Sequence, residues 1–82
     1  MRIEPLRSDL IIYLKKHCLI KKFDKQVQLF CSNFRHPSLH TEALEPKSLK
    51  IYSFRIDRKY RAIFILTQSD VAEIVDINDH YR

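Results

Sequence analysis

The fold is decided by residues 51–66, which read IYSFRIDRKYRAIFIL. Apolar and polar side chains alternate up to residue 56, and a period of two is typical of a strand that buries one face. The polar residues 57–59 interrupt this pattern and predict a tight turn, after which residues 60–66 read as a second strand. The stretch therefore predicts a β-hairpin with a short loop.

The sequence on either side of this hairpin extends the sheet. Residues 67–70 are polar and predict a second turn, and residues 71–77 predict a third strand. Three strands joined by short loops form an antiparallel meander. Residues 1–6 can add an edge strand, because Pro5 is tolerated at the edge of a sheet.

The first half of the chain has a helical pattern. Ser8 is a plausible N-cap, and Asp9 follows in the first turn, where a carboxylate favours the positive end of a helix. Apolar residues then recur at helical spacing in two stripes that meet at a hinge near residues 18–20. Residues 35–48 contain two prolines and read as a loop. The first stripe is Leu10, Ile11, Leu14 and Cys18, and the second is Ile20, Phe23, Val27, Phe30 and Phe34.

Helices first and strands last predict an α+β fold. An N-terminal helical hairpin is expected to pack on one face of a twisted antiparallel β-sheet. The chain has 82 residues, so residues 1–82 are expected to form a single domain.

The composition narrows the classes of function. There are 15 Lys and Arg against 10 Asp and Glu, a formal net charge of +5, and glycine is absent. The absence of glycine excludes phosphate-binding loops built on that residue, so any phosphate has to be bound by side chains or helix N-termini. The positive charge favours a polyanionic partner such as nucleic acid, although it also serves simply to keep a small protein in solution.

Cysteine usage and hydropathy bear on the compartment. Cys18 and Cys31 stand beside apolar residues and are predicted to be buried, reduced thiols. Two cysteines and four scattered histidines show no zinc-ligand spacing, so no metal site is predicted. No apolar run approaches the roughly 18 residues of a membrane span. The early apolar stretch, residues 10–14, ends at two lysines without a cleavage site, so we expect a cytoplasmic protein.

Loop lengths predict the register of the sheet. A loop at 57–59 pairs Arg55 with Arg61, and a loop at 67–70 pairs Arg61 with Asp76. Two arginines opposite each other repel, which indicates either an anion bound between them or neutralisation of Arg61 by Asp76. This register predicts a core face of Tyr52, Phe54, Ile56, Tyr60, Ala62, Phe64, Leu66, Val71, Val75 and Ile77 with one charged member, Glu73, and places Ile63, Ile65 and Ile74 on the other face.

Basic residues concentrate between Arg35 and Arg61, where the formal charge is +4 and tyrosines lie among the cations. Such interleaving indicates RNA binding, although packing at the sheet edge is the simpler explanation of the tyrosines. Among the histidines, His17 is predicted to lie on the surface. His80 is the best candidate for acid–base chemistry, because it leaves the sheet at the end where Asp76 lies.

Three segments resemble the RelE/ParE superfamily, the toxic halves of bacterial type II toxin–antitoxin modules. They are residues 35–39 (RHPSL), 52–64 (YSFRIDRKYRAIF) and 76–80 (DINDH). The resemblance covers most of the chain and implies the same helical hairpin against a twisted antiparallel sheet. It implies ribosome-dependent cleavage of mRNA in the RelE-like branch and inhibition of DNA gyrase in the ParE-like branch. The arginine pair with a terminal histidine is more similar to the RNase branch.

The resemblance also implies roles for individual residues. The 2′-hydroxyl of the RNA would attack the neighbouring phosphate, so no metal and no cofactor are required. Arg55 and Arg61 would stabilise the charge on the phosphate. His80 would be the general acid or base, with Lys59 or His36 as its counterpart. The residues expected to bind the RNA are Arg35, His36, Lys47, Lys50, Arg58, Tyr60 and Tyr81.

The partners that the resemblance implies are a cognate antitoxin, the ribosome and mRNA, with neither a membrane nor a small-molecule cofactor. Two features depart from the family pattern. Asn78-Asp79 replaces the small residues that relatives carry before the histidine, and the tail after His80 is short. The alternative to an RNase is therefore a binding protein, either a gyrase inhibitor or an inactive toxin that only binds an antitoxin.

Overall fold

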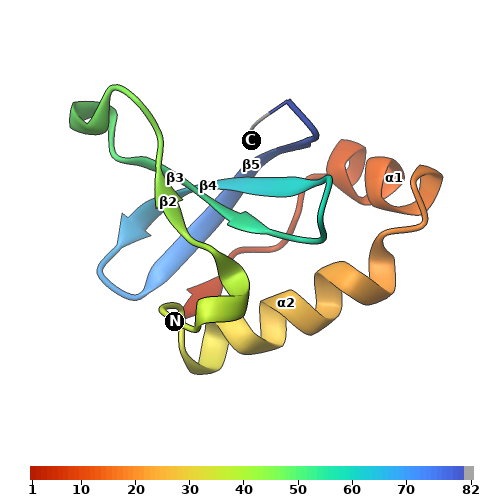
Figure 1. The fold of residues 1–82 in the computed structure, drawn as a ribbon, viewed down its shortest axis with the longest axis horizontal. Helices are drawn as coiled ribbons and strands as arrows, with labels where there is room; N and C mark the ends of the chain where they lie inside the picture. Colours follow the sequence, from red (N-terminus) through yellow and green to blue (C-terminus); the bar gives the residue numbers. More distant parts are fainter. Residues whose placement is uncertain (81–82) are drawn as a thin grey trace.

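A computed structural model describes residues 1–80, which form two helices and a five-stranded sheet (Figure 1). The strand order is β1-β5-β4-β3-β2, and neighbouring strands are antiparallel except that β1 runs parallel to β5. The elements are β1 (Arg2–Ile3), α1 (Ser8–Lys16), α2 (Ile20–Ser32), the short 3-10 helices η1 (Pro37–Leu39) and η2 (Lys47–Leu49), β2 (Glu42–Ala43), β3 (Ile51–Arg55), β4 (Arg61–Gln68) and β5 (Val71–Asn78).

This architecture confirms the predicted α+β fold with a helical hairpin on one sheet face. The predicted edge strand in residues 1–6 is confirmed as β1, but its parallel pairing makes the sheet mixed and not wholly antiparallel. The predicted loop of residues 35–48 also contains β2, which adds an edge to the sheet beside β3. None of the helices within residues 1–80 has the length and hydropathy needed to cross a membrane.

The start of the helical hairpin differs from the prediction. Ser8 is already the first helical residue, so the N-cap is Arg7, and no side chain caps the helix. The Asp9 carboxylate instead accepts a hydrogen bond from Arg7 Nε at 3.0 Å. The predicted hinge is confirmed, because α1 ends at Lys16 and Cys18 adopts a left-handed backbone with φ 56° before α2 begins.

Aromatic rings hold the helices to the sheet. Phe30 of α2 is fully buried, and its ring centroid lies 5.1 Å from those of Phe54 on β3 and Phe64 on β4. Phe23, two helical turns earlier, stacks on Phe54. The apolar stripe of α2 is therefore a core stripe, and only Phe34, which follows the helix, is exposed. The core also includes Leu10, Leu14, Leu19, Leu39, Ile56, Ala62, Ala72, Ile74 and Ile77.

The predicted β3–β4 register is confirmed, with Arg55 opposite Arg61. The predicted β4–β5 register is wrong: Arg61 lies opposite Asn78, and Asp76 lies opposite Ile63. The turn between β4 and β5 is shorter than predicted, because β4 continues to Gln68, and the ladder contains two irregularities. Together they change the partner of every β4 residue on β5.

The shifted register also changes the two faces of the sheet. Ile74 belongs to the core instead of the open face, and Glu73 lies opposite Ile65 on the face away from the helices. Leu66, predicted to be in the core, is 43% exposed. Both cysteines are exposed, which corrects the prediction of buried thiols. Cys18 stands in the hinge itself, and Cys31 lies on the outer face of α2.

Candidate functional site

The candidate site begins with the arginine pair on the sheet face that turns away from the helices. Side chains alternate across a strand, so Arg55 and Arg61 point opposite to the core residues Phe54 and Ala62. The two arginines differ in environment. Arg55 is partly exposed, whereas Arg61 is buried, with only 7% of its surface accessible.

Arg61 is held by a fork of hydrogen bonds. Its Nε donates to Ser53 Oγ at 2.8 Å, and its Nη2 donates to the Ser53 carbonyl at 3.3 Å and to the His40 carbonyl. Ser53 reaches Arg61 because both lie on the same face of neighbouring strands. His40 reaches it because its left-handed backbone, with φ 45°, turns the chain from η1 towards β2.

This fork leaves one part of the guanidinium free to act on a ligand. Within residues 1–80, Nη1 of Arg61 donates no hydrogen bond, and it is not a fully buried atom. A guanidinium whose orientation is fixed by two of its nitrogens is preorganised to bind an oxyanion through the third.

The surroundings of Arg61 exclude one of the two interpretations of the arginine pair. Burial lowers the pKa of the Arg61 guanidinium, the negative charge of Glu42 raises it, and the positive charge of Arg55 lowers it. Asp76 is not its partner: the Asp76 carboxylate accepts hydrogen bonds from the Asn78 side chain at 2.7 Å and from the Ile77 backbone N–H. Neutralisation by Asp76 is thus wrong, because the β4–β5 register carries that residue away.

Glu42 is a candidate site residue that the sequence analysis missed. It lies on β2 opposite Ser53, on the face of the arginine pair, and its charge acts on Arg61. The sequence signal is weak, because β2 has only two residues in a segment broken by prolines. A strand this short has no periodicity to read, so its position beside β3 emerges only in the folded chain.

The C-terminal histidine lies at the same end of the sheet as the arginine pair. His80 follows Asn78, which is opposite Arg61, and the His80 backbone N–H donates to Asn78 Oδ1 at 3.1 Å. Its side chain is 81% exposed, with Nε2 3.7 Å from Asp79 Oδ1. Lys59 Nζ lies 3.9 Å from Asp79 Oδ2. Asp79 therefore stands between the two exposed basic groups predicted to take part in catalysis.

Comparison with known proteins supports the fold. No protein-family model and no curated protein matches the sequence. Among solved structures, a YoeB/ParE toxin from Agrobacterium tumefaciens has a TM-score of 0.73 and 16% identity, over 99% of this chain and 100% of that one. YafQ from E. coli strain BL21(DE3) also has a TM-score of 0.73, with 11% identity over 96% and 90% of the two chains.

A third similar structure is a heterotetrameric YoeB–YefM toxin–antitoxin complex from Staphylococcus aureus, with a TM-score of 0.69 and 18% identity over 98% of this chain and 94% of that one. The chain has the RelE/ParE toxin fold. The fold implied by the sequence resemblance is thereby confirmed over almost the whole chain.

Within this fold, Tyr60 is tied to α1. Its Oη lies 3.1 Å from His17 Nδ1, within hydrogen-bond distance, and its ring contacts those of His17 and Tyr13 with centroids 5.4 and 6.1 Å away. The prediction of a surface His17 is wrong, because the side chain is partly buried in this contact. Tyr60, predicted to bind RNA, thus also fastens the β3–β4 turn to the helical hairpin.

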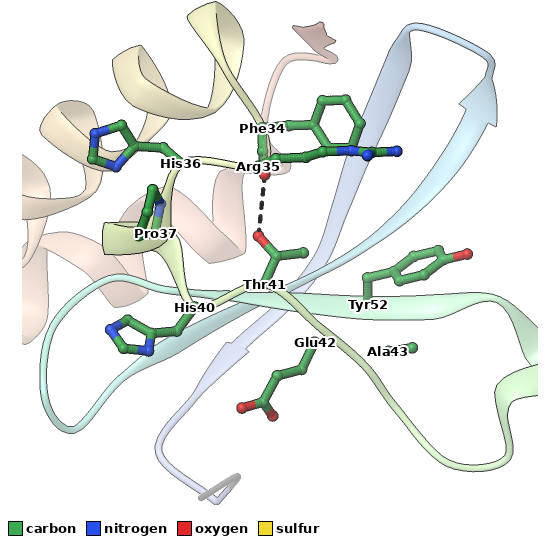
Figure 2. Close-up of a pocket in the computed structure, with 9 residues that line it drawn as sticks. All are labelled: Phe34, Arg35, His36, Pro37, His40, Thr41, Glu42, Ala43 and Tyr52. Atoms are coloured by element: carbon green, nitrogen blue, oxygen red, sulfur yellow. Dashed lines mark hydrogen bonds between the residues drawn. The ribbon is translucent and has the colours of Figure 1, made fainter.

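Arg35 and His36 line a pocket of about 480 Å³ at the β2 edge of the sheet, together with Tyr52 and residues 40–43 (Figure 2). In Figure 2 the Arg35 guanidinium and the Tyr52 ring extend towards the same side of this pocket. His36 Nδ1 accepts a hydrogen bond from the Ser38 backbone N–H, so this nitrogen serves the 3-10 turn.

The remaining predicted binding residues are dispersed. Arg58 is exposed in the β3–β4 turn, close to the arginine pair. Lys47 in η2 and Lys50, directly before β3, are exposed, and Arg55 lies at the opposite end of β3, a strand about 13 Å long. Tyr81 lies outside the described residues. Within residues 1–80, no three side chains of His, Cys, Asp or Glu are grouped so that they could hold a metal ion.

Proposed function

We propose that this chain is the toxin of a type II toxin–antitoxin pair and that it cleaves mRNA on the ribosome, in the cytoplasm. The observation that carries the proposal is the preorganised Arg61 guanidinium, with Arg55 opposite it, Glu42 beside it and His80 at the same end of the sheet. A cationic fork beside a carboxylate and an imidazole supports phosphodiester chemistry. Two of the similar solved structures are named as toxins, and one of these two is a toxin–antitoxin complex.

The proposed reaction uses the RNA as its own nucleophile. Glu42 accepts the proton of a ribose 2′-hydroxyl, and the resulting oxygen attacks the adjacent phosphorus. The bond from phosphorus to the 5′-oxygen breaks, and the protonated His80 imidazole gives its proton to that oxygen. The products are a 2′,3′-cyclic phosphate and a 5′-hydroxyl. Arg55 and Nη1 of Arg61 stabilise the charge that develops on the phosphate oxygens.

The proposed regulator is a cognate antitoxin. An antitoxin segment carrying carboxylates complements a chain of net charge +5. It inhibits the enzyme if it covers the arginine pair, since Arg55 is accessible from the same face that the RNA uses.

The test is primer extension on a reporter transcript in a cell-free system to which the purified chain is added, with translation either active or blocked at initiation. We expect 5′-hydroxyl ends inside the reading frame only when the transcript is translated. Cuts that appear equally on untranslated RNA would remove the ribosome from the proposal. If the transcripts stay intact, expression of the chain in cells separates the alternatives. DNA breaks that depend on gyrase would assign the chain to the gyrase inhibitors. Normal growth, together with binding of the antitoxin, would make it an inactive toxin.

Two variants connect the cleavage to the proposed site. Arg55→Gln and His80→Gln change accessible side chains, so both are expected to fold and to abolish the cuts. Arg2→Gln is the matched control, because Arg2 is an exposed arginine at the other edge of the sheet. Arg61→Ala is less informative, since Arg61 is buried and holds the segment before β2, so its loss changes stability as well as chemistry.

A further inference from the structure

The hinge between α1 and α2 carries a group of lysines that the proposed reaction does not use. Five lysines stand within eleven residues at this hinge, and all are exposed. Asp24 is the one acidic residue in the same stretch. The five are Lys15 and Lys16 at the end of α1 and Lys21, Lys22 and Lys25 at the start of α2.

The fold places this hinge against the β3–β4 turn. Lys22 Nζ lies 3.1 Å from Asp57 Oδ2 in that turn, and Tyr60 contacts His17 at the end of α1. Figure 1 shows the connection between the two helices and the β3–β4 turn on the same side of the molecule. We call the combined set of cations the hinge surface; it consists of Lys15, Lys16, Lys21, Lys22, Lys25, Arg58 and Lys59.

The hinge surface holds most of the excess charge of the chain. Its seven cations are offset by Asp24, Asp57 and Asp79, which leaves a formal charge of +4 out of the +5 of the entire protein. The sequence analysis found a formal charge of +4 between Arg35 and Arg61, but the fold also brings the lysines of the helical hairpin next to Arg58 and Lys59 of that segment.

The hinge surface also borders the proposed site. Lys59 belongs to it and lies 3.9 Å from Asp79, the residue before His80. A polyanion lying along the hinge surface is thus directed past His80 towards the arginine pair.

We propose that the hinge surface binds the phosphate backbone of helical RNA and anchors the protein beside its substrate. Six of the seven cations are lysines. A lysine ammonium group acts as a point charge and lacks the planar two-pronged geometry of arginine, so a group of lysines is better suited to binding a row of backbone phosphates than to reading base edges. The inference rests on the proposed function in identifying this RNA as ribosomal. It differs from that function in assigning affinity to the five lysines of the helical hairpin, which have no role in the proposed cleavage.

The test measures how salt weakens binding to a fluorescein-labelled 20-base-pair RNA duplex and, in parallel, to purified small ribosomal subunits. The variant is Lys21→Gln with Lys25→Gln, which removes two charges from α2 without loss of helix propensity. If each lysine neutralises one phosphate, the slope of log K against log salt becomes shallower by about 1.8. The control is Arg2→Gln with Arg7→Gln, which removes the same formal charge outside the hinge surface and is expected to leave the slope of the wild-type protein.

Two outcomes would overturn the inference. One is that the hinge variant does not differ from the control. If both keep the wild-type slope, the two lysines contact no phosphate, and if both slopes change equally, only the net charge of the protein matters. The other is a hinge variant that binds RNA normally but loses affinity for a polyglutamate peptide, which would assign the surface to an acidic protein. A wild-type chain that cuts no transcript yet shows the lysine-dependent slope refutes the proposed function and leaves this inference standing.

Discussion

Replacement of Ser53 by alanine tests whether the hydrogen bonds of Arg61 stabilise the fold and fix the orientation of its guanidinium. Ser53 is fully buried on β3, and its Oγ accepts the 2.8 Å hydrogen bond from Arg61 Nε. The substitution removes this acceptor and leaves the Ser53 backbone carbonyl in place. An N–H of a buried guanidinium then loses its partner in a region that water does not readily reach.

The expected loss follows from the charge and burial of this contact. A hydrogen bond to a charged group contributes about 1.5–3 kcal/mol, and leaving a buried donor unsatisfied costs a similar amount. A central value of about 2 kcal/mol corresponds to a decrease in Tm of about 8–16 °C in a domain of this size. The expected total stability is about 4–12 kcal/mol, so the variant remains folded at room temperature.

The assay is thermal unfolding followed by far-ultraviolet circular dichroism at pH 7, together with the rate of the proposed mRNA cleavage at 25 °C. Ser69→Ala, in the exposed β4–β5 turn, is the matched control and should unfold within about 3 °C of the wild type. The cutting rate of Ser53→Ala should fall, since Arg61 no longer has a fixed orientation. A Tm for Ser53→Ala as close to the wild type as that of the control would refute the reasoning, because Arg61 would then need no anchor on β3.

Three further substitutions test other parts of the structure. Phe30→Ala should lower the free energy of unfolding by about 3–5 kcal/mol, seen as a lower urea midpoint with an unchanged slope, because the ring is fully buried in the aromatic core. Tyr60→Phe should cost about 1 kcal/mol, and a double-mutant cycle with His17→Phe that shows no coupling energy would contradict their contact. Although burial raises the pKa of Asp57, hydrogen bonds from the Tyr60 and Lys59 backbone N–H groups and from Lys22 hold that pKa below its ordinary value. Its carboxylate therefore stabilises the fold above about pH 4, and this stability is lost as the pH falls through the folded-state pKa, so Asp57→Asn should destabilise the protein at pH 7 but have little effect on urea unfolding near pH 2.

The β3–β4 hairpin shows how far the sequence can be interpreted on its own. Its register was predictable because a short polar turn leaves few ways to pair the flanking residues, and Arg55 does lie opposite Arg61. The same reasoning failed one turn later, where β4 extends to Gln68 and irregularities shift its pairing with β5. Side-chain alternation does not reveal such an irregularity in advance, because the extra residue is accommodated by the neighbouring strand.

The sequence by itself determined the order of helices and strands, the apolar stripe of α2 and the opposition of the two arginines, since periodicity and turn length are local properties of the chain. Only the tertiary structure decided how those arginines are buried, oriented and surrounded. Arg61 is buried and oriented because the His40 carbonyl, 21 positions away, meets it across the sheet edge, and Glu42 arrives on a strand too short to predict. Likewise, the positive charge gathers at the hinge because Lys22 and Asp57, 35 positions apart, come together. Long-range contacts of this kind depend on how the core packs, which no local pattern specifies.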